Sequence, residues 1–501
     1  MAELVPAPVV WPMLTAILLL ALGSHPRAQR LVSLASLAGL LGVAVALAVA
    51  TADGTVLVHR LGSWPAPFGI VLVVDRLAAV MLLLTAGTGL AVLLYEAATR
   101  DPRLERLPFL PLFQFLVMGI DGAFVTGDLF NLFVFFEVLL IASYGLLTLG
   151  ASARQLRAGL QFVVLNLLAS ALFLFGVGVL YGLTGTLNLA DLAVKVPAVA
   201  AGDGAGLLHV ATMTLLVVFA TKAALLPLAF WLPDAYPAPP VAVSAMFGGI
   251  ATKVGVYALL RVWTTAFDGV RASGAEVMLA LGTVSMLVGV LGAVSQTELR
   301  RLLSFHIVSQ IGYLVFGIGL FTVAGVAAAI VYLVHYTIVK CALFLLAGAT
   351  ERVGGSPELG RLGGVAHVSP ALGALFLVAG LSLAGLPPTS GFVSKALLAG
   401  AGIGAERWLG VTVVFVAGLL TLFSMMKIWT SAFWGTPAQP AAAPPRAGAL
   451  LAVGLLVSFS VTLAAAADPL WRYAEATATQ LLDVPSYVAA VAPALPAGGG
   501  R

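Results

Sequence analysis

The feature that most constrains this chain is a series of apolar stretches of about 20 residues that follow one another along nearly its whole length. Such a stretch is long enough to cross a lipid bilayer as a helix. Only helices and closed barrels satisfy the backbone in lipid, and these stretches lack the alternation of barrel strands. Charged residues make up only 9% of the chain, against roughly 25% in soluble domains. The sequence therefore predicts an all-α polytopic membrane protein.

The apolar pattern predicts about fourteen transmembrane helices. Their expected ranges are roughly 8–23, 30–51, 69–95, 107–126, 128–149, 157–182, 207–231, 241–264, 274–295, 302–321, 323–349, 371–402, 408–434 and 446–467. The N-terminus lacks a basic region, so we expect the first stretch to be a retained helix and not a cleaved signal peptide. The tail from Asp468 is rich in Ala and Pro, carries a short amphipathic patch, and is assigned no core role.

Basic residues concentrate in alternate loops. The loops after odd-numbered segments hold Arg27, Arg30, Arg100, Arg103, Arg106, Arg154, Arg157, Arg300, Arg301, Arg352, Arg361 and Arg446, and the others hold only Arg60, Lys195, Arg271 and Arg407. The positive-inside rule places the first set in the cytoplasm, so both termini are predicted outside. A net charge of +4 is accounted for by this orientation, and no basic patch interleaved with aromatics suggests nucleic acid.

Two segments are interrupted by proline, each beside a lysine. Pro227 breaks segment 207–231 next to Lys222, and Pro387 and Pro388 break segment 371–402 next to Lys395. The broken segments are an odd number of segments apart, so they run in opposite directions, as in an inverted repeat. Interrupted segments at matching positions indicate a transport site.

Ionisable residues lie deep inside several segments. Glu137 is about 12 Å along its helix, and Lys222 is its expected partner because opposite charges offset each other's desolvation. Lys253 is central in the next segment, where a buried lysine can exchange protons. The alternative is a static pair that only joins two helices. Arg261 is expected to extend toward the interface, and Asp75 and Asp128, near segment ends, are expected to be interface or cap residues.

Two histidines extend this polar set. His306 and Gln310 share one helix face, and His335 is followed by Lys340 in the next segment. Imidazole titrates near neutral pH and suits a proton relay, although a lone buried histidine is more often structural. Two interpretations of Lys427 are equally supported: an accessory role in translocation, or extension of the side chain toward an aromatic interface. No motif for a cofactor, phosphate or metal is present, the single Cys341 permits no disulfide within the chain, and no carboxylate cluster suggests a sodium site.

Four sequence segments resemble one protein family. They are KAALLPLAFWLPDAYPAPPVAVSAMFGGIATKVGVYALLR, RRLLSFHIVSQIGYL, HYTIVKCALFLLAGA and LAGLPPTSGFVSK. They are similar to the proton-conducting antiporter-like subunits shared by respiratory complex I, membrane-bound hydrogenases and Mrp multisubunit cation/proton antiporters. Lysine at position 395, the WLPDAYPAPPVAVSA segment and the length near 500 residues resemble the D subunits of Mrp-type Na⁺/H⁺ antiporters in particular.

The resemblance implies a division of the chain. It predicts N-terminal helices 1–3 over residues 1–106, then inverted five-helix repeats over 107–264 and 265–434, with broken helices 7 and 12. Residues 435–501 would hold helix 14 and a short tail. By motif match the ion-translocating residues would be Glu137, Lys222, Lys253, His335, Lys340 and Lys395. His306, Gln310 and Lys427 are added as possible accessory residues from their own positions in the segments.

The resulting hypothesis is a subunit of a hetero-oligomeric Na⁺/H⁺ antiporter in a prokaryotic cell membrane. It would move protons through the buried row together with other membrane subunits, and it needs no cofactor. One alternative is a proton-pumping subunit of complex I (NADH-quinone oxidoreductase) or a membrane-bound hydrogenase, without a redox site of its own. A membrane scaffold with static buried pairs is the other alternative.

Overall fold

The structure, a computed structural model, describes residues 1–23, 25–100, 104, 107–436 and 443–492. It confirms the all-α membrane fold, because 12 helices of the described chain are long and apolar enough to cross a membrane. Two further predicted segments correspond to the shorter apolar helices α5 (Phe109–Val125) and α17 (Pro370–Ala384). All fourteen predicted segments therefore contain helix, while fourteen membrane crossings stay a prediction.

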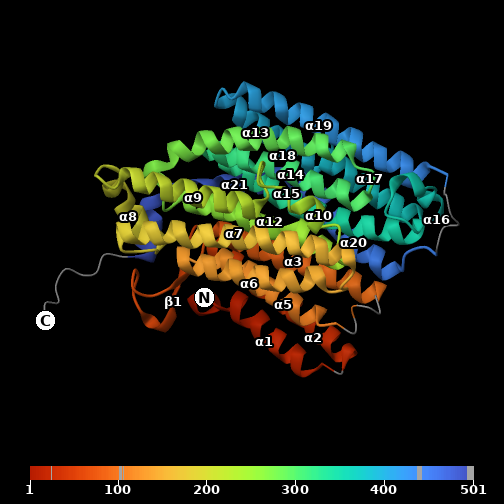
Figure 1. The fold of residues 1–501 in the computed structure, drawn as a ribbon, viewed down its shortest axis with the longest axis horizontal. Coiled ribbons are helices and arrows are strands. Elements are labelled where there is room, and N and C mark those ends of the chain that lie inside the picture. Colours follow the sequence, from red (N-terminus) through yellow and green to blue (C-terminus); the bar gives the residue numbers. More distant parts are fainter. Residues whose placement is uncertain (24, 101–103, 105–106, 437–442, 493–501) are drawn as a thin grey trace.

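The N-terminal helices are α1 (Ala7–Ala21) and α2 (Pro26–Thr51), at the lower edge of Figure 1, and α3 (Arg76–Thr99). The strands β1 (Leu57–Arg60) and β2 (Val71–Val74) pair antiparallel ahead of α3, with Leu57 opposite Val74. The predicted helix 69–95 thus begins later than expected. Asp75 starts it, since its carboxylate accepts the backbone N–H of Ala78 at 3.0 Å, as expected of a capping residue.

The next helices are α5, α6 (Leu129–Thr148), α7 (Ala153–Thr184) and α9 (Ala205–Ala223), with the short α8 (Leu189–Ala200) between α7 and α9. Asp128 caps α6, as predicted, by accepting the N–H groups of Phe130 and Asn131. After α9 come the short α10 (Leu232–Ala235) and then α11 (Val241–Met246), a π-helical turn at Phe247–Ala251 and α12 (Thr252–Thr264). These three pieces after α10 form one continuous apolar segment.

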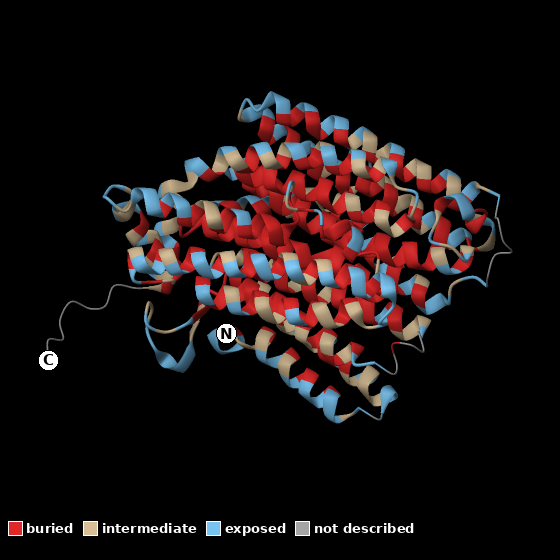
Figure 2. Ribbon diagram, in the orientation of Figure 1, coloured by how far each residue is buried: buried red, intermediate tan, exposed pale blue. Residues whose placement is uncertain are grey.

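The second half contains α13 (Arg271–Ser295), α14 (Leu299–Gly319), α15 (Val323–Gly354), the short α16 (Val365–Val368), α17, α18 (Ser390–Gly404), α19 (Trp408–Ile428) and α20 (Ala447–Ala465). The helix α15 occupies the core and is buried along its whole membrane-sized window. Figure 2 shows the same burial at the centre of the molecule, while the outer helices alternate exposed and buried residues. The second broken segment, α17 and α18, packs on this central helix, and α11 and the π-helical turn pack on it from the first half of the chain.

The C-terminal tail forms two helices within its described residues and has a larger part in the fold than its composition suggested. Residues Ala467–Leu482 form the amphipathic helix α21, which packs against α15, and Val484–Val491 form α22. The side chain of Arg76 donates to the carbonyl of Ala476 at 3.1 Å, and Gln480 donates to the carbonyl of Gly54 at 2.7 Å. The expectation of no core role is wrong, because α21 covers a face of α15 and holds the start of α3.

Candidate functional site

The predicted site residues are buried. The exposed fractions are 5% for Lys222, 0% for Lys253, 1% for His335, 0% for Lys340 and 8% for Lys395, which excludes ordinary surface lysines. Glu137 is intermediate in exposure. Ionisable groups at membrane depth are costly and are functional by default. The central helix α15 carries His335 and Lys340, and it packs against α18, which carries Lys395.

Glu137 and Lys222 are linked through a third residue. The ammonium Nζ of Lys222 donates to Ser170 Oγ at 3.0 Å and to the carbonyl of Asn166 at 3.3 Å. The Ser170 hydroxyl in turn donates to the Glu137 carboxylate. The structure links the two predicted partners through a hydroxyl, because α7 lies between α6 and α9 and places Ser170 between the two charges. A hydroxyl both donates and accepts, so this link can pass a proton.

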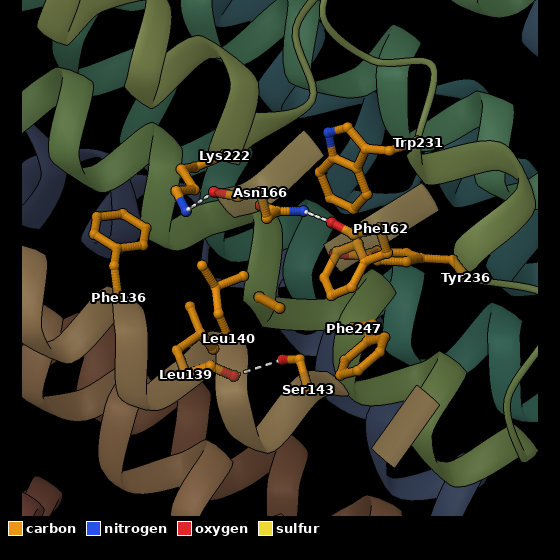
Figure 3. Close-up of a pocket in the computed structure, with 11 residues that line it drawn as sticks. Phe136, Leu139, Leu140, Ser143, Phe162, Asn166, Lys222, Trp231, Tyr236 and Phe247 are labelled. Atoms are coloured by element: carbon orange, nitrogen blue, oxygen red, sulfur yellow. Dashed lines mark hydrogen bonds between the residues drawn. The ribbon is translucent and has the colours of Figure 1, made fainter. Parts of the chain in front are cut away.

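A small cavity of about 20 Å³, room for about one water molecule, lies beside Lys222, as Figure 3 shows. Its walls come from α6, α7, the break after α9, and the π-helical turn before α12. The lining includes Ser143, Asn166 and Lys222 together with the aromatic rings of Phe162 and Trp231. The indole N–H of Trp231 donates to the carbonyl of Thr221 at 3.1 Å, which satisfies part of the backbone freed at the break.

Lys253 is held by backbone and by an aromatic ring. Its Nζ donates to the Gly248 carbonyl at 2.6 Å and lies 3.9 Å from the ring centroid of Tyr336. The π-helical turn lies directly before Lys253, and such turns disturb the regular bonding of helix carbonyls. A Cβ on Gly255 would lie 2.4 Å from the backbone nitrogen of Ala223, so α12 contacts the last turn of α9 at this glycine. The glycine thereby brings the turn of Lys222 against the helix of Lys253.

On α15, Lys340 and His335 each keep a polar atom without a partner among the described residues. Within the described chain, Lys340 Nζ has no hydrogen-bond partner and lies 5.7 Å from the ring centroid of Phe344. The π-helical turn before Lys253 packs on α15 next to Lys340, since a Cβ on Gly249 would lie 3.2 Å from the Cβ of Cys341. His335 Nδ1 lies 2.8 Å from Ser390 Oγ, while its Nε2 has no partner in the part of the chain that the structure describes.

The accessory pair on α14 reaches two different helices. His306 Nε2 lies 2.6 Å from Ser424 Oγ of α19, and the Gln310 side-chain oxygen accepts from the hydroxyl of Tyr332 on α15. Both side chains are fully buried. The i, i+4 spacing therefore aligned them along the core but did not bring them to a common partner.

Lys395 closes the second break. Its Nζ donates to the carbonyls of Leu383 at 3.0 Å and Ala384 at 2.8 Å, the last turn of α17. Both breaks begin with a residue in the left-handed region, Ala224 at φ 60° and Gly385 at φ 89°. Lys222 precedes its break, however, while Lys395 follows its break. The breaks correspond in form, but the two lysines are not at corresponding positions.

Lys427 and Arg261, both predicted to extend toward the membrane interface, make different contacts. Lys427 donates to the carbonyls of Val294 and Gln296, at the end of α13, and lies outside the row. Arg261 does not extend to the interface, because it is buried and forms a two-pronged ion pair with Asp75 at 2.6 and 2.7 Å. Burial raises the pKa of the Asp75 carboxyl, but the adjacent Arg261 guanidinium offsets this, and the net pKa lies below 3.8.

Sequence reasoning missed several polar residues. Asp121 on α5 is fully buried, and its two carboxylate oxygens have no hydrogen-bond partner among the described residues. A charge inside the apolar stretch 107–126 was the signal that could have found it. The bridging Ser170 had no such signal, because serine is common in membrane helices. In the described chain no three His, Cys, Asp or Glu side chains gather as metal ligands.

Residues 126–421 match the family described as "NADH:quinone oxidoreductase/Mrp antiporter, TM". A relative in Alkalihalophilus pseudofirmus, named as the D subunit of a Na(+)/H(+) antiporter, is 44% identical over 98% of this chain and 99% of that protein. A Bacillus subtilis protein of the same name is 37% identical over 97% of this chain and 98% of its own length.

Solved structures agree with this similarity. A chain in the structure of the Mrp complex from Dietzia sp. DQ12-45-1b superposes with a TM-score of 0.91 and 35% identity, covering 98% of this chain and 100% of that chain. A chain of respiratory complex I from Thermus thermophilus superposes with a TM-score of 0.74 and 26% identity, covering 93% of this chain and 98% of that chain.

Proposed function

Because this chain belongs to the NADH:quinone oxidoreductase/Mrp antiporter family of membrane subunits, we propose that it translocates protons and cations within a multisubunit Na⁺/H⁺ antiporter. The two relatives named as Na⁺/H⁺ antiporter subunits match nearly its whole length. The single observation that carries the mechanism is a row of ionisable side chains that runs from the half-buried Glu137 through the buried Lys222, Lys253, Lys340, His335 and Lys395. Soluble or purely structural helices have no need of such a row.

In this proposal the Glu137–Ser170–Lys222 link loads the first proton. The cavity beside Lys222 admits water to that lysine. A charged Lys222 makes a charge on Lys253 less favourable, since like charges in a poorly hydrated interior repel strongly. The same repulsion between Lys253 and Lys340 passes the proton along α15, toward His335 and Lys395.

We also propose an orientation in the membrane, a division into two repeats and a set of neighbouring subunits. Both termini face outward in a bacterial plasma membrane, following the loop charges. Residues 107–264 and 265–434 form the two inverted repeats, which accounts for the similar breaks after α9 and α17. The chain works beside other membrane subunits of the same antiporter, as the relatives' names and the Mrp complex structure suggest.

A redox-driven pump is the competing reading, favoured by the similarity to a chain of complex I. There the same helices would move protons while electron transfer occurs in other subunits. Purification of the complex from its own membranes separates the two readings. Membrane subunits without iron–sulfur proteins support the antiporter, and co-purifying iron–sulfur proteins would contradict it.

The test of the mechanism is Glu137→Gln in the complete complex. We expect loss of Na⁺/H⁺ antiport in membrane vesicles, because an amide cannot take up the proton that Ser170 passes. The protein should still insert and assemble. Glu475→Gln, on the exposed face of α21, is the matched control and should keep normal antiport. Undiminished antiport in Glu137→Gln would reject the proton route.

A further inference from the structure

Three serine side chains from three helices meet at the second helix break. Ser382 lies in the last turn of α17, Ser390 begins α18, and Ser460 lies in α20. The hydroxyl oxygens are 2.8 Å apart for Ser390 and Ser460, 3.3 Å for Ser382 and Ser460, and 3.5 Å for Ser382 and Ser390. The residues are only 1–3% exposed. They form a buried triangle of oxygens, which we call the serine triangle.

The break adds backbone oxygens and a proton-carrying group beside this triangle. The last helical residues of α17 are Leu383 and Ala384, whose carbonyls accept from the Lys395 ammonium. The C-terminal end of a helix carries partial negative charge. In transporters with broken helices, such half-helix ends and freed carbonyls coordinate the coupled cation.

We propose that the serine triangle, with the carbonyl end of α17, binds the alkali cation that this chain exchanges for protons. The inference rests on the proposed antiport function and adds a place for the cation within this chain. Hard monovalent cations take oxygen ligands, and a site of neutral oxygens at a half-helix end needs no carboxylate cluster.

The size of the triangle selects among cations. Its edges of 2.8–3.5 Å suit oxygens that share one ion at about 2.3–2.6 Å, the range known for Ca²⁺, which Na⁺ resembles in radius. The larger K⁺ requires wider spacing of its ligands. The site should therefore prefer Na⁺ or Li⁺ to K⁺.

When a cation binds, each serine hydroxyl can point its hydrogen away from the cation and donate to another acceptor. Within a helix, a serine can donate to the carbonyl four residues earlier, which is available to Ser382 and Ser460. Ser390 lies 2.8 Å from His335 Nδ1 and can donate to it when that nitrogen carries no proton. All three oxygens can then face the cation with their lone pairs.

Proton and cation compete at this position. The titratable groups at the break are Lys395 from α18 and His335 from α15, with Tyr313 of α14 under Lys395 at 5.0 Å from its ring centroid. Tyr332 of α15 packs against both Tyr313 and His335. The charge of Lys395 also reaches His306 of α14. The described parts of α17 and α20 contribute no titratable side chain. A cation in the triangle repels the ammonium of Lys395, so one binds as the other loses its proton.

The two helix ends at the second break lie so close together that glycine is required at two positions. A Cβ on Gly391 would lie 1.7 Å from the Ser382 carbonyl oxygen and 3.0 Å from Cε1 of His335. A Cβ on Gly385 would lie 2.7 Å from Cδ of Lys395. The two glycines let the ends of α17 and α18 close on the histidine and the lysine together.

The test measures Na⁺ dependence of antiport in vesicles that contain the complete complex. Ser460→Ala and Ser382→Ala should each raise KM for Na⁺ about tenfold while the rate at saturating Na⁺ is kept, because one of several ligands is lost. Ser460→Thr keeps a hydroxyl and should restore the KM. Ser458→Ala, exposed on the same helix, is the matched control and should match the unmodified complex.

A second readout is independent of transport. Addition of NaCl to the purified, weakly buffered complex should release protons, and KCl should release fewer. Ser460→Ala should require about tenfold more NaCl for the same release, and Lys395→Ala should abolish it. An unchanged KM and an unchanged NaCl requirement in both serine-to-alanine variants would overturn the cation site. If Glu137→Gln still abolishes antiport in that case, the proposed function stands and only the cation site fails.

Discussion

At the scale of single residues, the contacts of the charged groups separate a transport row from a set of structural pairs. Asp75 and Arg261 bind each other directly through two short contacts, and Asp75 also caps α3. Such a pair holds helices together, since separating it leaves a buried charge without a partner. Glu137 and Lys222 differ, because each binds Ser170 instead. A bridging hydroxyl keeps both charges separable, which proton transfer requires.

We predict that Ser170→Ala lowers antiport at least tenfold, because it removes the hydroxyl that joins Glu137 to Lys222. Ser170→Thr retains the hydroxyl and should keep most of the activity. The measurement is Na⁺-dependent proton movement in vesicles with equal amounts of assembled complex. Ser273→Ala, exposed on α13, is the control. Equal activity in Ser170→Ala and Ser170→Thr would assign Ser170 to packing alone.

At the scale of elements, glycines decide how closely the interrupted helices approach their neighbours. Gly255 lets α12 contact the end of α9, where Lys222 lies. On the other side of the core, a Cβ on Gly289 of α13 would lie 2.4 Å from the backbone nitrogen of Ser309 on α14. Small residues permit such close helix contacts in membranes. Gly255 thus sets how closely α12 approaches the break after α9, and Gly289 sets how closely α13 approaches α14.

We predict that Gly255→Ala destabilises the protein by roughly 1–3 kcal/mol, the usual cost of overpacking, and lowers antiport. The added methyl group must push α12 away from the Lys222 turn. Thermal unfolding of the purified complex and vesicle transport measure the two effects. Gly178→Ala is the control, since nothing lies within 4 Å of a Cβ at this exposed position on α7. Equal melting temperatures of the Gly255→Ala and Gly178→Ala variants would contradict the close contact between α12 and α9.

At the scale of the whole molecule, the chain is built around α15. Helices of both halves pack on it, including α3, α11, α14, α17, α18 and α20. The amphipathic helix α21 covers a further face, and the hydroxyl of Tyr473 donates to the carbonyl of Arg76 at 3.2 Å. In Figure 1 this helix is labelled between α8 and α15, although it comes near the end of the chain. The C-terminal segment therefore closes the core.

We predict that a chain ending at residue 466 assembles poorly and melts several degrees lower, because α21 no longer covers α15 or holds the start of α3. Removal of residues 493–501 alone is the control and should have little effect. Yield of the assembled complex and its melting temperature are the measurements. Normal assembly of the chain that ends at residue 466 would show that α21 is not needed, in line with the minor role that the composition of the tail suggested.

The sequence by itself determined the fold class, the approximate positions of the long apolar helices, both breaks and the depth of Lys222, Lys253 and Lys395. It could do so because each membrane segment must satisfy its own backbone, so length, hydropathy and proline act locally. Only the tertiary structure decided the partners: Ser170 between Glu137 and Lys222, Asp75 for Arg261, and three serines around the second break. These contacts join helices far apart in the chain, and they depend on how each helix is rotated and packed. Segments that are apolar on every side carry no record of that rotation, because their periodicity does not distinguish one face from another.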